Sequence, residues 1–156
     1  MATYLVKHTR TRPTMQGHWD GPAWNSIESV AIASACPGRV SRHKPETHVK
    51  LQYDGRGIYG IFKVKDQYIR CTTIQHNGSV CTDSCVEFFV KPHRGEGYFN
   101  FEFNCGGTLL CSYIRDHTRI DGGFRDFTPI PREDAVMLDI YHTMPRYIPQ
   151  EIEEQR

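Results

Sequence analysis

Two stretches of sequence decide the fold: Asp83-Ser84-Cys85-Val86-Glu87-Phe88-Phe89-Val90 and Tyr98-Phe99-Asn100-Phe101-Glu102-Phe103-Asn104. Residue types alternate along both, so each stretch predicts a β-strand with two unlike faces. In the second stretch, every other residue is Phe, and the residues between them are Asn or Glu. In the first, Glu87 lies opposite the side that carries Val86 and Phe88. The pattern therefore predicts an antiparallel pair of strands with an aromatic face turned inward and a polar face turned away from it.

Further strands are expected along most of the chain, because apolar or alternating segments recur between turn residues. The clearest are His48–Tyr53 and Ile58–Val64, which flank Asp54-Gly55-Arg56-Gly57, a sequence that favours a tight hairpin turn. Helical periodicity is nearly absent. We therefore predict an all-β fold, an antiparallel β-sandwich of the immunoglobulin-like or jelly-roll type. An incomplete C-terminal part of this sandwich is an open alternative. One domain is expected over residues 1–143, and residues 144–156 are expected to form a frayed or extended tail.

Composition excludes several classes of function. The chain has 156 residues, 12% of them aromatic, and a formal net charge of +1 without a basic block. A nucleic-acid partner is not expected, since such sites usually show a clustered positive patch. No apolar run is long enough to cross a membrane, so no membrane association is expected. The N-terminus lacks the apolar segment of a secretory signal, which predicts a cytoplasmic location if that terminus is native.

The six cysteines are an even number, which would allow disulfides in a secreted protein. We favour free thiols, because Cys85, Cys105 and Cys111 lie in or beside predicted strands, where cysteine behaves as a small apolar residue. Disulfides and a metal site remain as alternatives. The spacing Cys81-x3-Cys85 is a weak metal motif, because no second pair answers it.

The polar face of the two opening stretches is the candidate binding site. Carboxylate and amide groups that are fixed on a rigid sheet can hydrogen-bond the hydroxyl groups of a polyhydroxylated ligand. The candidates on this face are Glu87, Asn104, Glu102 and Asn100. Their residue types therefore predict recognition of a sugar.

Sugar recognition also needs an aromatic platform for the apolar face of the ring. Phe89 is the first choice because it shares a strand face with Glu87, and Tyr68 and Tyr98 are alternatives. Arg70, in the connection that precedes the first strand, is the cation that we expect beside the site. Trp24, close to Pro22, is expected to be a core residue.

The ordered motifs Trp19-Asp20-Gly21-Pro22-Ala23-Trp24, Val49-Lys50-Leu51-Gln52-Tyr53-Asp54 and Ile58-Tyr59-Gly60-Ile61-Phe62-Lys63-Val64-Lys65-Asp66 precede the two opening stretches. Together, the set resembles the carbohydrate-binding modules of family 9, and most of all the bacterial family 9-like group. The resemblance extends over nearly the whole chain. It implies an immunoglobulin-like β-sandwich that binds mono- or oligosaccharides without catalysis, in proteins that are often associated with glycoside hydrolases and carbohydrate catabolism.

The resemblance also implies roles for single residues. Glu87 matches a glutamate that hydrogen-bonds sugar hydroxyls, and Asn104 matches an asparagine that contacts the sugar. Glu102 stands where those members have an arginine, and Cys81 stands where they have one of two tryptophans that clamp the sugar ring. The second tryptophan belongs to a C-terminal part of the family pattern that continues past the region matching Pro149–Arg156.

A sheet that lacks closing strands exposes an edge, so the resemblance also leaves room for a partner chain that covers it. Family 9 modules can carry structural calcium, and Asp83 is the candidate oxygen ligand, although a turn or cap role is favoured for it. No other cofactor is expected.

Two further functions stay open. A glycoside hydrolase would use Glu87 and Glu102 as its carboxyl pair, and neighbouring strands can provide the separation of about 5–9.5 Å that such enzymes need. Its acid would also need burial in a cleft to raise its pKa, which an open sheet face does not favour. A structural or interaction domain that has lost sugar binding is the other alternative, since Cys81 replaces an aromatic platform and fold does not imply function.

Overall fold

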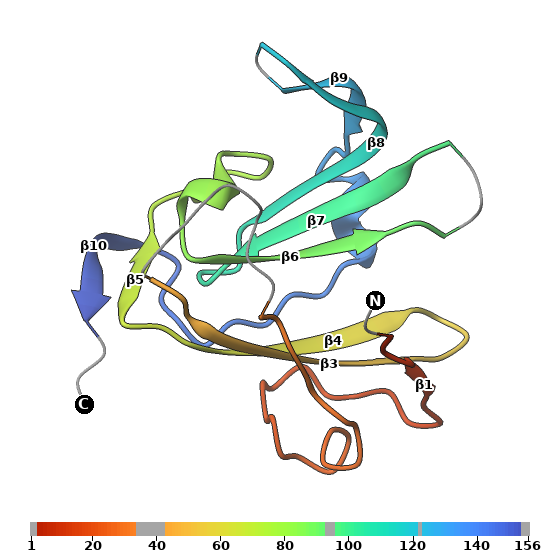
Figure 1. Ribbon diagram of the computed structural model, residues 1–156. Helices are drawn as coiled ribbons and strands as arrows, with labels where there is room; N and C mark the ends of the chain where they lie inside the picture. Colours follow the sequence, from red (N-terminus) through yellow and green to blue (C-terminus); the bar gives the residue numbers. More distant parts are fainter. Residues whose placement is uncertain (1–2, 34–42, 93–95, 122, 154–156) are drawn as a thin grey trace. The chain divides into compact units, whose positions relative to one another are not determined.

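The computed structural model describes residues 3–33, 43–92, 96–121 and 123–153, of which the side chains of residues 150–153 are not described (Figure 1). Its elements are β-strands and two short 3-10 helices, with no α-helix in these ranges. Within them, no helix has the length and hydropathy needed to span a membrane. The predicted all-β class is therefore confirmed. The chain divides into two compact units, Met1–Gln67 with Glu154–Arg156, and Tyr68–Glu153, and each is described separately below.

The first unit is built on a long hairpin. Strand β3 (Glu46–Tyr53) pairs antiparallel with β4 (Ile58–Lys65) along its whole length, from Glu46 opposite Lys65 to Tyr53 opposite Ile58. The predicted turn between them forms, and Asp54 Oδ1 accepts hydrogen bonds from the backbone N–H groups of Arg56 (2.7 Å) and Gly57 (3.1 Å). Two short strands complete this sheet, β1 (Lys7–His8), parallel to β3, and β2 (Val30–Ala31), antiparallel to it.

The segment Trp19–Trp24 is fastened to β3 by a buried lysine. Lys50 Nζ donates hydrogen bonds to the carbonyl oxygens of Trp19 (3.1 Å) and Trp24 (3.0 Å) and lies 4.5 Å from the centre of the Trp19 ring. Gln52, also buried, donates from Nε2 to the carbonyl oxygen of Ala23 at 3.1 Å. Trp24 is buried, as predicted, and Trp19 is half-buried.

The second unit contains two sheets. Its main sheet has the order β6-β7-β8-β9 with antiparallel neighbours, drawn from green to blue in Figure 1. A second sheet pairs β5 with β10, and the helices η1 and η2 lie in the connections. The elements are β5 (Tyr68–Cys71), η1 (Val80–Thr82), β6 (Cys85–Val90), β7 (Tyr98–Asn104), β8 (Leu109–Ile120), β9 (Gly123–Pro129), η2 (Asp134–Met137) and β10 (Ile148–Glu153).

Both opening stretches of the sequence form the predicted strand pair, β6 and β7. The core of this unit contains small and aliphatic side chains, namely Cys71, Val80, Leu109, Cys111, Ile114 and Ile148. The phenylalanines of β7 form a row of stacked rings, with 5.9 Å between the ring centres of Phe99 and Phe101 and 6.4 Å between those of Phe101 and Phe103.

The polar side of β7 differs from the prediction. Asn100, Glu102 and Asn104 were expected to be solvent-facing, but they are 4%, 9% and 3% exposed, whereas the three phenylalanines are half-buried. Alternation showed that the two faces are unlike, but it did not show which face other segments would cover. The polar groups are therefore interior groups that need hydrogen-bond partners.

The C-terminal segment, residues 144–156, was expected to be a frayed or extended tail. Within it, Ile148–Glu153 forms β10 and pairs antiparallel with β5, and residues 154–156 lie outside the described residues. Ile148, opposite Cys71, is buried. Burial of this residue and the backbone pairing give the segment a defined place in the second unit.

Candidate functional site

Two glutamates lie side by side on one face of the main sheet. In the antiparallel register of β6 and β7, Glu87 is directly opposite Glu102, so their Cβ atoms are separated by about 4.5–5.5 Å. Asn100 is two residues from Glu102 on the same face, and its Nδ2 donates a 2.8 Å hydrogen bond to Glu102 Oε1. The sheet therefore brings together three of the residues that the sequence predicted to bind a ligand.

This group has more acceptor atoms than donors. Glu102 Oε2 and Asn100 Oδ1 are buried, and neither has a hydrogen-bond partner among the described residues. A buried polar atom without a partner costs about 1–3 kcal/mol, and more if it is charged. A ligand that donates hydrogen bonds to these two atoms would recover that free energy.

The electrostatics of the pair distinguish its two members. Glu87 is the exposed partner, whereas Glu102 is nine-tenths buried. Partial desolvation of the carboxyl group and the negative charge of Glu102 raise the pKa of Glu87, and the guanidinium of Arg119 opposes this shift. The pair is consequently a negatively charged site in which the two carboxylates repel each other.

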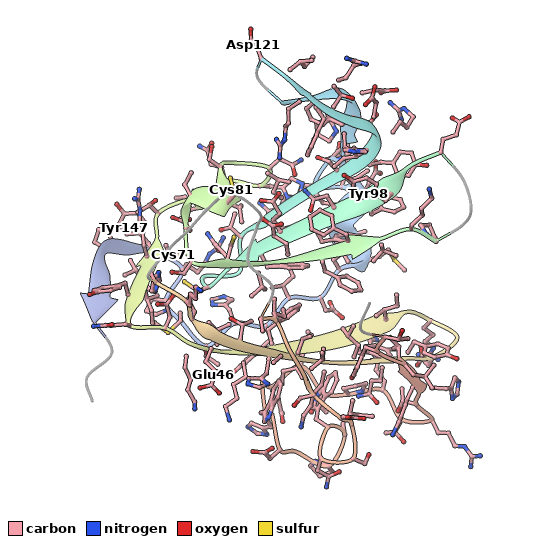
Figure 2. All side chains as sticks on the ribbon, in the orientation of Figure 1. Glu46, Cys71, Cys81, Tyr98, Asp121 and Tyr147 are labelled. Atoms are coloured by element: carbon pink, nitrogen blue, oxygen red, sulfur yellow. The ribbon has the colours of Figure 1, made fainter. Side chains whose placement is uncertain are left out.

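An aromatic pocket adjoins the carboxylate pair. Phe89 is opposite Asn100 in the strand register and is 54% exposed. Its ring meets that of Tyr98 edge to face, with 5.9 Å between the ring centres, and Figure 2 shows Tyr98 on the β6–β8 sheet. Together with Val90 and Lys91, these rings line a shallow pocket of 340 Å³ that is wide open to solvent. Phe89 follows Glu87 by two residues, so the pocket is about 7 Å along the strand from the carboxylates.

Asn104 has a different environment from Asn100, although both belong to the polar side of β7. Its Nδ2 donates to the carbonyl oxygen of Thr73 (2.8 Å) and to Asp83 Oδ2 (3.0 Å). Its Oδ1 accepts a 2.8 Å hydrogen bond from the backbone N–H of Thr108. Three bonds within the chain thus occupy the amide group that was predicted to contact sugar.

Asp83 is the centre of the same network. Its carboxylate accepts hydrogen bonds from the backbone N–H groups of Thr72 (2.9 Å) and Thr73 (2.9 Å) and from the Thr72 hydroxyl (3.0 Å). Desolvation opposes ionisation, but these hydrogen bonds outweigh it and lower the pKa of Asp83. Asp83 does not fit the calcium role that the resemblance implied, because both of its oxygens already accept hydrogen bonds from the chain.

The other predicted residues lie near this network. Arg70 Nε is 4.0 Å from Asp83 Oδ1, and half of the Arg70 side chain is exposed. Cys81 is exposed within η1. Sequence reasoning did not single out Arg119, which lies near the end of the long strand β8 (Leu109–Ile120).

Metal-binding groups do not gather in the described ranges: no cluster of three or more His, Cys, Asp or Glu side chains could hold an ion there. The described cysteines carry free thiols, and Cys36 is outside the described residues. Burial, together with nearby negative charges, raises the pKa of Cys85 to about 12, so its thiol stays protonated near neutral pH. The described cysteines are Cys71, Cys81, Cys85, Cys105 and Cys111.

Comparisons with known proteins agree with this architecture. A crystal structure at 2.70 Å resolution from Bacteroides uniformis ATCC 8492, described as that of a candidate carbohydrate-binding protein, is similar at 30% sequence identity and a TM-score of 0.66. The similarity covers 82% of this chain but only 56% of that one, so the chain spans little more than half of its length. No match to a curated protein was found. The model of carbohydrate-binding family 9 matches residues 24–123, which include the β3–β4 hairpin and strands β6, β7 and β8 of the main sheet. The chain belongs to that family.

Proposed function

We propose that this protein binds a mono- or oligosaccharide without catalysis, at the face of β6 and β7 that carries Glu87, Glu102, Asn100, Phe89 and Tyr98. These five residues are called the β6–β7 site below. One observation carries the proposal. Two buried acceptor atoms, Glu102 Oε2 and Asn100 Oδ1, have no hydrogen-bond partner among the described residues, and the exposed ring of Phe89 is on the same face of the sheet.

The chemistry of the site suits a sugar ring. Hydroxyl groups of the ligand would donate hydrogen bonds to the carboxylates and to Asn100 Oδ1, while Phe89 and Tyr98 would cover an apolar face of the ring. The open hollow that both rings line together with Val90 and Lys91 has 340 Å³, and exposed Glu87 is two residues along the strand from Phe89. A polar array next to an apolar wall is the usual composition of a small-molecule site.

Asn104 and Arg70 have supporting roles in this proposal. Asn104 is a positioning residue, because its amide ties the end of β7 to Thr73 and Asp83. Arg70, which is 4.0 Å from Asp83, flanks that network rather than the carboxylate pair. Neither residue is assigned a direct contact with the sugar.

The test is titration of the protein with a panel of mono- and disaccharides, in which binding is measured by calorimetry or by NMR chemical shifts. We expect binding by the native chain and a loss of about 10-fold or more in Glu87→Gln, since a hydrogen bond to a charged group contributes about 1.5–3 kcal/mol. Asp121→Asn is the matched control, because Asp121 lies at the tip of the β8–β9 hairpin (Figure 2). A folded native protein that binds no sugar at millimolar concentration would refute the proposal and favour a structural or interaction domain.

A glycoside hydrolase remains the second candidate, because Glu87 is opposite Glu102 and its pKa is raised, as a catalytic acid requires. Hydrolysis of a chromogenic glycoside by the native chain, lost in Glu87→Gln, would support this function. Sugar binding without hydrolysis would leave the non-catalytic function.

A further inference from the structure

We infer that the β6–β7 site prefers a sugar with a protonated amino group to the equivalent neutral sugar. This inference rests on the proposed carbohydrate-binding function and specifies its ligand class. It comes from two observations: Glu87 and Glu102 face each other across β6 and β7, and the buried atoms Glu102 Oε2 and Asn100 Oδ1 have no donor among the described residues.

Hydrogen-bonding capacity is the first argument. Both unpartnered atoms can only accept, and Asn100 Nδ2, the neighbouring amide donor, is already bonded to Glu102 Oε1. A sugar hydroxyl both donates and accepts, whereas an ammonium group has three donors and no acceptor. The ammonium therefore matches a surface of acceptors more completely than a hydroxyl does.

Charge is the second argument. The carboxylates of Glu87 and Glu102 repel each other, and the pKa of Glu87 stays raised even though Arg119 is close enough to lower it. The Arg119 guanidinium is also engaged with a ring of β9, 3.9 Å from the centre of Phe124. The face thus retains an excess of negative charge that a ligand cation would neutralise.

Access to the pair is through Glu87. Its side chain is exposed, so an ammonium group can form a direct ion pair with it from solvent. Because Coulomb attraction falls only with the inverse of distance, Glu102 adds to the attraction for a cation that is paired with Glu87. Among the described residues that line the aromatic pocket, Lys91 is the cation, and it follows Glu87 by four residues.

The experiment compares three probes of one ring type: 2-amino-2-deoxyglucose, its N-acetyl derivative and glucose. Titrations are followed by NMR at low and high salt, at a slightly acidic pH where the free amine is protonated. We expect the amino sugar to bind at least about fivefold more tightly than either neutral probe, and high salt to weaken only the amino sugar, because exposed ion pairs are screened.

Variants connect the preference to this site. In Glu102→Gln, which keeps the shape of the side chain, the ratio of amino-sugar to glucose affinity should fall but stay above one, since Glu87 alone then attracts the ligand cation. In Asp121→Asn, which removes the same charge from the hairpin tip, the ratio should stay as in the native chain.

Each contrary outcome has a distinct meaning. Equal affinity for glucose and the amino sugar overturns the inference and leaves carbohydrate binding intact. A preference that is undiminished in Glu102→Gln, or that disappears in Asp121→Asn, overturns the assignment to the β6–β7 site. Binding of no probe in the panel, neutral sugars included, refutes the proposed function itself.

Discussion

The two asparagines of β7 should respond very differently to the same substitution. Asn100 and Asn104 are on the same side of one strand and are 4% and 3% exposed. Asn104 makes three hydrogen bonds through its amide, one of them to the Asp83 carboxylate, whereas Asn100 makes one, to Glu102. The change to Ala therefore removes equal volumes but unequal numbers of hydrogen bonds.

The expected magnitudes follow from these bonds. Each neutral hydrogen bond contributes about 0.5–1.5 kcal/mol, and each bond to a charged group about 1.5–3 kcal/mol. Asn104→Ala should lower the free energy of unfolding by about 3–5 kcal/mol, because it also leaves the buried Thr108 N–H without its acceptor. Asn100→Ala should cost less, about 1–2 kcal/mol, because removal of the unpartnered Asn100 Oδ1 offsets part of the cost of leaving Glu102 Oε1 without its donor.

The assay is urea denaturation followed by far-UV circular dichroism and tryptophan fluorescence. A second readout is sugar titration of each folded variant, in which Asn100→Ala should weaken binding and Asn104→Ala should do so only through loss of structure. Equal destabilisation by both variants would refute the argument, because it would mean that these hydrogen bonds do not distinguish the two asparagines. A fully stable Asn104→Ala variant that no longer binds sugar would return Asn104 to the role of a direct ligand contact.

Three further predictions concern single groups. Glu102→Gln should lower the pKa of Glu87, measured by NMR titration, because partial desolvation remains but the repelling charge is gone. A carboxyl pKa that is higher in the folded than in the unfolded protein makes stability fall as the pH rises from the unfolded pKa through the folded pKa. Thermal melts across this pH range should therefore show a smaller loss of stability for the variant than for the native chain. Lys50→Met should destabilise the first unit by about 2–4 kcal/mol in urea, because the buried Trp24 carbonyl and the part-buried Trp19 carbonyl lose their donor. A change under about 1 kcal/mol would contradict the role of Lys50 in holding this segment on β3. Gly107→Ala should cost at least about 1–3 kcal/mol in the same assay, because Gly107 has a φ of 82° and an added Cβ would collide with the His142 ring, whereas Gly55→Ala, with no heavy atom in reach, is the control that should change little.

The sequence by itself determined the local structure. Alternation in Cys85–Val90 and Tyr98–Asn104 set strands β6 and β7, since side chains of an extended chain point to opposite faces in turn. The Asp-Gly turn after Tyr53 set the β3–β4 hairpin, because its residues accept the tight backbone path without help from distant segments. The motif order was likewise enough to predict the family.

Tertiary structure alone decided which polar groups are available to a ligand. Glu87 and Asn104 looked equivalent in sequence, yet Glu87 is exposed, whereas Asn104 is held by Thr73 and Asp83 from a connection more than twenty residues earlier in the chain. Burial depends on which distant segment packs over a face, and periodicity carries no information about that. The same reason explains β10, whose pairing with β5 joins residues far apart in sequence and could not be predicted from the local pattern of Ile148–Glu153.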